Sequence, residues 1–128
     1  MKQVLLVGVG GFLGSIARYK LGGIVLHYSA AERFPLSTFA VNVLGCLIAG
    51  LLAGCVQHYG MFSADTRLFL FTGLLGGFTT FSAFGLESVL LIRRGELSVA
   101  ASYIALSVVV GMFAFWLGLV AVARRIES

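Results

Sequence analysis

Four long apolar stretches constrain the fold of this chain more than any other feature of its sequence. A helix that crosses a bilayer needs about 20 mostly apolar residues, and four segments reach that length: residues 4–26, 37–56, 68–92 and 99–122. With 59% hydrophobic and 11% charged residues, the 128-residue chain lacks the polar surface that a soluble domain needs. We therefore predict an all-α membrane protein with four transmembrane helices, forming a single domain over residues 1–128.

The segments outside these stretches are short. They cover about residues 29–36, 57–66 and 93–98, which leaves no room for a soluble domain. The first stretch lacks the small-residue cleavage site of a secretory signal, so we interpret it as a retained first helix. The net charge of +4 comes from basic residues that stand singly or in pairs at helix ends, such as Arg93 with Arg94. This pattern indicates anchoring at the membrane interface and no nucleic-acid partner.

The sequence lacks the motifs that would indicate an enzyme. Gly8 and Gly10 resemble the start of a glycine-rich dinucleotide turn, but Leu13 occupies the position of the last glycine. A dinucleotide-binding fold also needs alternating strands and helices, and the three remaining stretches are too long and too apolar to be such elements. Neither an HExxH nor a GxSxG motif is present. Cys46 and Cys55 both lie in the second stretch, and we interpret them as buried thiols. We predict a protein that is not an enzyme.

Basic residues are balanced between the two sides of the membrane. Four spans put both termini on one side, which allows the residues to be counted by side. The terminal side carries Lys2, Arg67, Arg124 and Arg125, and the other side carries Lys20, Arg33, Arg93 and Arg94, with Arg18 deeper in the first span. Such a balance gives the positive-inside rule little to act on. Either another feature fixes the orientation, or the chain inserts in both directions. Dual insertion predicts an antiparallel homodimer with a two-fold axis in the membrane plane.

Glycine and threonine residues crowd the middle of the third stretch and favour a break in the helix from Gly76 to Thr80. Non-helical backbone at membrane depth is tolerated where it is buried in protein or lines a wet cavity, and its free carbonyls can bind a cation. In an antiparallel dimer, two such breaks could face each other on the axis. Glycines four residues apart also predict close helix contacts. These pairs are Gly10 with Gly14, Gly50 with Gly54, and Gly73 with Gly77.

Aromatic and polar side chains recur at helical spacing around this segment. Phe81 and Phe84 are three residues apart, so they lie on one face of a helix. A phenyl ring has a positive edge, so two ring edges at a narrow passage could stabilise a small anion; packing between helices is the alternative. Two polar pairs at i and i+4 mark other helix faces, Thr38 with Asn42 and Tyr103 with Ser107. They predict either interhelical hydrogen bonds or donors along an anion path.

Over essentially its whole length, the chain resembles the small fluoride channels called Fluc or CrcB. The resemblance rests on three motifs: Gly76-Gly77-Phe78-Thr79-Thr80-Phe81-Ser82-Ala83-Phe84, Asn42-Val43-Leu44-Gly45, and Gly10-Gly11-x-x-Gly14-x-x-x-Arg18-Tyr19. It implies an antiparallel dual-topology homodimer with two fluoride pores and a structural sodium ion at its centre. The implied activity is passive export of fluoride across the plasma membrane of a bacterium, its inner membrane.

The resemblance also implies roles for individual residues. Phe81 and Phe84 match the family's aromatic box, and Asn42 matches its pore asparagine. Gly76 and Thr79 match the residues whose backbone carbonyls hold the sodium ion. Further pore residues are implied at the polar positions Thr38, Ser82, Tyr103 and Ser107. Ala83 replaces a threonine that this motif often carries, so we expect no pore hydroxyl at that position.

A proton-coupled exporter is the main alternative, because small four-helix dual-topology proteins also include multidrug transporters. Such coupling needs an ionisable group near the substrate site, and Glu87 is the only acidic residue within a predicted span. It follows Thr79 by about 12 Å along a helix axis, so it lies toward one end of the span. We interpret Glu87 as a hydrogen-bonding or vestibule residue. A non-transporting assembly subunit is a third alternative.

Overall fold

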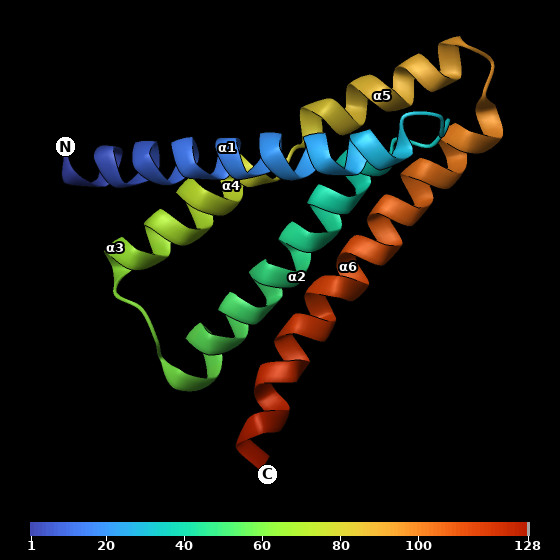
Figure 1. The fold of residues 1–128 in the computed structure, drawn as a ribbon. Helices are drawn as coiled ribbons and strands as arrows, with labels where there is room; N and C mark the ends of the chain where they lie inside the picture. The colour runs from blue at the N-terminus through green and yellow to red at the C-terminus, as the bar shows by residue number, and fades with distance from the viewer. Residues whose placement is uncertain (128) are drawn as a thin grey trace.

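Helices dominate the computed structural model, which describes residues 1–127 (Figure 1). The elements are α1 (Lys2–Ser29), α2 (Leu36–Tyr59), α3 (Ala64–Arg67), the π-helix η1 (Leu68–Leu75), α4 (Gly76–Phe78), α5 (Phe81–Arg93) and α6 (Leu97–Glu127). Elements α3, η1, α4 and α5 together make one span, so 4 segments of the described chain are long and apolar enough to cross a membrane. The prediction of four transmembrane helices is confirmed.

Helices α2 and α6 run side by side, and glycines allow their backbones to approach closely (Figure 1). A Cβ atom added at Gly54 would lie 2.9 Å from the Val122 side chain, and one added at Gly118 would lie 2.7 Å from the backbone nitrogen of Leu51. Real Cβ contacts are not that short, so only glycine fits at these positions. Small residues permit such approach in lipid, where no hydrophobic driving force holds helices together.

Helix α1 packs in the same way against the first half of the third span. A Cβ atom at Gly10 would lie 2.9 Å from the backbone nitrogen of Leu74, and one at Gly77 would lie 3.0 Å from the Cα atom of Gly11. Gly14 and Gly73 are also buried in this contact. The glycine pairs of the first and third stretches therefore face each other, and the predicted close helix contact is confirmed.

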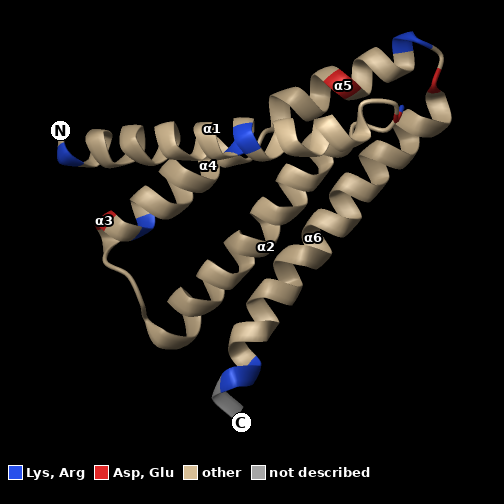
Figure 2. Ribbon diagram, in the orientation of Figure 1, with Lys and Arg blue, Asp and Glu red and all other residues tan. Residues whose placement is uncertain are grey.

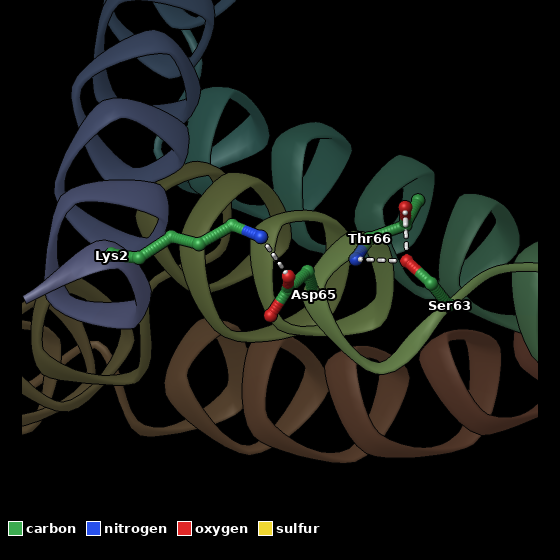
Figure 3. A network of polar contacts seen from close by, with 4 residues as sticks. All are labelled: Lys2, Ser63, Asp65 and Thr66. Atoms are coloured by element: carbon green, nitrogen blue, oxygen red, sulfur yellow. Dashed lines mark hydrogen bonds and ion pairs between the residues drawn. The ribbon is translucent and has the colours of Figure 1, made fainter.

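Charged residues lie mostly at helix ends (Figure 2). The Lys2 ammonium group lies 2.6 Å from Asp65 Oδ2, which joins the start of α1 to α3 (Figure 3). Ser63 caps α3, because its hydroxyl accepts a hydrogen bond from the Thr66 N–H at 3.2 Å. These contacts fix one end of the third span beside the start of the first. Arg18 and Lys20 are exceptions, because they lie within α1 and not at its ends.

The third span breaks near its middle, as predicted. Thr79 and Thr80 have extended backbone, with φ/ψ values of −83°/158° and −148°/117°. The break is narrower than expected, because Gly76 is helical with φ −61° and ψ −37°. The π-helix η1 before the break was not predicted. Its end is marked by a hydrogen bond from the Gly76 N–H to the Phe71 carbonyl. Such π-turns depend on tertiary packing, and they are frequent near functional sites.

Candidate functional site at the helix break

The side chain of Asn42 holds the break in place. Its Nδ2 group donates to the Thr80 carbonyl at 2.9 Å, and its Oδ1 atom accepts from the Thr80 N–H at 2.8 Å. One amide on α2 therefore satisfies both backbone groups of a residue that has left the helix. Unpaired backbone groups are costly at membrane depth, so this pair of hydrogen bonds stabilises the extended conformation of Thr80.

Two threonine hydroxyls complete the ends of the broken helix. The Thr79 Oγ1 hydroxyl donates to the Leu75 carbonyl at 2.9 Å, which also accepts from the Thr79 N–H at 2.9 Å. The Thr80 Oγ1 atom accepts from the Ala83 N–H at 3.1 Å and caps α5. Both hydroxyls are thus engaged with backbone groups. These hydrogen bonds define the local structure of the break, which is not a frayed helix end.

Four successive carbonyls at the break, those of residues 76–79, have no hydrogen-bond partner among the described residues. Among residues 1–127, no hydrogen bond ends on the carbonyl of Gly76 or on that of Thr79. Gly76 is exposed in the single subunit, and Thr79 is half-buried. No group of at least 3 His, Cys, Asp or Glu side chains that could hold a metal occurs in the described part of the chain. Free carbonyl oxygens are ligands that sodium accepts in membrane proteins, so the residues present fit a monovalent cation bound by backbone.

A groove of about 360 Å³ lies beside the break. It gathers five of the residues that the sequence proposed for ion binding, namely Asn42, Thr79, Phe81, Phe84 and Ser107. Its other lining residues are Gly45, Cys46, Ala49, Leu75, Thr80, Val108 and Phe115. The groove lies at the beginning of α5, where the first N–H groups of a helix lack intrahelical partners and carry partial positive charge. These N–H groups favour an anion at the start of α5, whereas the free carbonyls belong to the other end of the break.

The two phenylalanines differ in their surroundings. Their ring centroids are 5.6 Å apart at an interplanar angle of 38°. Phe84 is half-buried and packs on Tyr103, with centroids 5.2 Å apart. Phe81 is 84% exposed, although it stands at the groove. A single subunit therefore leaves one ring of the pair uncovered.

Two residues of the expected polar path lie elsewhere, at Glu87. Thr38 Oγ1 donates to Glu87 Oε1 at 2.7 Å, and the Tyr103 hydroxyl donates to Glu87 Oε2 at 2.7 Å. Tyr103 is fully buried, and Thr38 is nearly so. Glu87 is thus a hydrogen-bonding residue, which was one of the two roles expected for it. Spacing did not reveal this cluster because its members lie on three different spans.

The two serines proposed for the pore occupy different positions. Ser107 lines the groove, and its buried hydroxyl has no hydrogen-bond partner among the described residues. Ser82 lies outside the groove lining and is exposed, with its hydroxyl 3.4 Å from that of Thr80. Of the two serines, only Ser107 lies at the groove, and its buried hydroxyl is unpaired among the described residues.

The comparison with protein families agrees with these features. The family model described as CrcB-like protein, Camphor Resistance (CrcB), matches residues 5–119. The chain belongs to the CrcB family. The resemblance stated from the sequence motifs is confirmed, and with four spans the chain is a multi-pass membrane protein.

Curated relatives of this CrcB-family chain are aligned along nearly their full length. A protein of Methylobacillus flagellatus is 53% identical over 128 residues, which is 100% of both chains. Proteins of Rhizobium etli and Flavobacterium psychrophilum are 47% and 41% identical, over 93% and 94% of this chain and 94% and 96% of their own. All three are named fluoride-specific ion channel FluC. The family is thus one of channels and not of enzymes, as predicted.

Proposed function

We propose that this chain forms a fluoride-selective channel that exports fluoride passively across the inner membrane of a bacterium. The names of its relatives support fluoride as the transported ion. The observation that carries the proposal is the break at Thr79 and Thr80, which Asn42 holds open beside a groove lined by Phe81 and Phe84. Two phenylalanine rings and a serine line the groove, and its lining contains no basic residue.

This chemistry suits fluoride, which is small and tightly hydrated. A pore that selects it must replace hydration water with closely placed donors. We assign this role to the Ser107 hydroxyl and to the N–H groups of Phe81 and Ser82, since that of Ala83 already donates to Thr80. The positive edges of two phenyl rings add attraction, and the absence of a full positive charge avoids trapping the ion. A larger anion such as chloride would gain less from the same narrow path.

The working unit of the proposal is an antiparallel homodimer with two pores. The exposed ring of Phe81 and the exposed backbone of Gly76 would both be covered by a second copy. The balanced Lys and Arg count supports insertion in both directions. Labelling of Ser98→Cys, in a chain whose Cys46 and Cys55 are replaced by alanine, tests this with a thiol reagent that does not cross membranes. We expect labelling from both sides; labelling from one side alone contradicts dual topology.

A sodium ion at the dimer centre is part of the same proposal. The free carbonyls of Gly76 and Thr79 supply two ligands per subunit, and a two-fold axis would bring four together. The ion would contribute fixed positive charge and hold the two breaks against each other. Replacing sodium by a heavier monovalent cation should give anomalous scattering between the subunits, and prolonged sodium removal should lower activity. Full activity and no bound cation would contradict this part.

Fluoride efflux from proteoliposomes tests the function itself. We expect rapid efflux that responds to the fluoride gradient, is far slower for chloride, and is unchanged by an imposed pH gradient. Dependence on the pH gradient would instead favour the proton-coupled exporter. Glu87, the acidic residue that such coupling would need, already accepts hydrogen bonds on both carboxylate oxygens. Absence of fluoride efflux from a folded, correctly assembled protein would refute the channel.

A further inference from the structure

Gly45 of α2 lies directly against the break. It is buried, and a Cβ atom placed on it would collide with the Thr79 Cγ2 methyl group and lie 3.3 Å from Phe78 Cδ1. The next glycine contact in the neighbourhood is far looser, because a Cβ atom at Gly111 would lie 3.5 Å from Cys46 Sγ. Any side chain at position 45 therefore meets the last helical residue before the break and the first residue in it.

The side chain of Thr79 cannot move aside without losing another contact. Its hydroxyl donates to the Leu75 carbonyl at 2.9 Å, which fixes the direction of its methyl group. Turning the methyl away from α2 would break this hydrogen bond or shift the backbone of Thr79. The carbonyl of that same residue is free. The contact with Gly45 thus influences where this carbonyl points.

Gly45 also lies one turn after Asn42 on the same face of α2. The two hydrogen bonds from Asn42 to Thr80 are 2.8 and 2.9 Å long, so they need α2 at its present distance from the break. A displacement of about 1 Å would stretch both beyond useful hydrogen-bonding geometry. The missing side chain at Gly45 therefore makes room for Thr79, and the Asn42 amide holds the next residue, Thr80.

We infer that Gly45 is a positioning residue for ion passage: the absence of its side chain lets Thr79 pack against α2, which sets the Thr79 carbonyl and keeps Thr80 within reach of Asn42. This inference rests on the proposed function, because it assigns Gly45 to the same groove. Gly45 contributes by lacking a side chain, which leaves room for the Thr79 methyl group.

Gly45→Ala is the direct test. Overpacking a tight contact is costly, and we expect fluoride efflux at least roughly tenfold slower than for the unmodified protein. Gly111→Ala is the matched control, since its added methyl group meets only an ordinary van der Waals contact, and it should retain efflux. Wild-type efflux in Gly45→Ala would overturn the inference but leave the channel function intact. Absence of efflux from the unmodified protein would instead refute the function.

A second-site change separates positioning from general misfolding. Thr79→Ser removes the methyl group that the new Cβ atom would strike, and it keeps the hydroxyl that donates to Leu75. We expect Gly45→Ala to slow efflux much less in the Thr79→Ser background, with Thr79→Ser alone as the reference. Thr80→Ser also removes a methyl group but not the colliding one, so it should give no rescue. Equal loss in both backgrounds would overturn the inference even if Gly45→Ala folds poorly.

Discussion

Two polar clusters lie along the same face of α2, and they differ in what they hold. The Asn42 side chain forms hydrogen bonds with both the N–H and the carbonyl of Thr80. At Glu87, two side chains from other spans, Thr38 and Tyr103, bind a third side chain. The first cluster therefore determines the course of the main chain. The second determines only where three side chains point.

This difference predicts different consequences of mutation. Backbone groups that lose a partner inside a membrane have no water to replace it, so the helix break depends on Asn42. Side chains can change rotamer and find other partners, and for this reason hydrogen bonds between spans contribute on average only about 0.6 kcal/mol. We expect changes at the first cluster to abolish ion passage, and changes at the second cluster to adjust stability.

The largest effect is expected at Asn42. Asn42→Ala leaves both backbone groups of Thr80 without a partner, which costs about 1–3 kcal/mol for each group. Asn42→Asp keeps the acceptor for the Thr80 N–H but loses the donor to its carbonyl. We expect fluoride efflux to be lost in both variants and the thermal unfolding temperature to fall more for Asn42→Ala. Normal efflux in Asn42→Asp would show that the carbonyl bond is dispensable.

The aromatic pair should separate function from subunit stability. Phe81→Ile and Phe84→Ile each remove a positive ring edge and retain apolar bulk, so both should slow fluoride efflux severely. Phe84→Ile should lower the unfolding temperature more than Phe81→Ile, because Phe84 packs on Tyr103 within the subunit, whereas Phe81 is 84% exposed there and loses contacts only with the proposed second copy. Efflux assays and thermal unfolding in detergent measure the two effects. Wild-type efflux in both variants would assign the rings to packing alone.

The same contrast explains how much the sequence could predict. The break was predictable because Gly76, Thr79 and Thr80 are poor helix formers in the middle of an apolar span. The family motifs then pointed to Asn42, Phe81 and Phe84, which the structure brings to one groove. What they did not reveal is that Asn42 acts on the backbone of Thr80. An amide at i+4 from Thr38 has the same pattern whether its partner is an ion or a carbonyl.

Other features lay beyond sequence reasoning because they depend on contacts between distant segments. The Glu87 cluster joins residues 49 and 16 positions away, and no periodicity relates them. The π-helix η1 has an ordinary apolar sequence. Gly45 was part of a motif, but its role follows from the approach of Thr79, 34 positions later in the chain. The helices themselves were predictable because each span is long enough to be recognised alone.

A smaller effect is expected at Glu87. Glu87→Gln keeps an oxygen that can accept from Thr38, and its Nε2 group can only donate to the Tyr103 oxygen, so the second hydrogen bond must reverse its direction. Both contacts become neutral hydrogen bonds, which should lower the free energy of unfolding by no more than about 1.7 kcal/mol. Fluoride efflux should fall far less than in Asn42→Asp, and it should remain unaffected by a pH gradient. A loss of efflux as large as that of Asn42→Asp would break the distinction between the clusters.

The smallest effect is expected at the hydroxyl of Tyr103. Tyr103→Phe removes its bond to Glu87 Oε2 but keeps the ring, whose centroid lies 5.2 Å from that of Phe84 and 5.3 Å from that of Phe34. Tyr28→Phe is the control, since Tyr28 is 84% exposed. Because Glu87→Met removes the polar partner altogether, adding Tyr103→Phe to it should change the free energy of unfolding by less than about 0.5 kcal/mol. Unfolding of the two single variants and the double variant in one detergent gives this coupling directly. If the two single effects simply add, the side chains of residues 87 and 103 contribute independently to stability, and the hydrogen bond between them contributes no coupling energy.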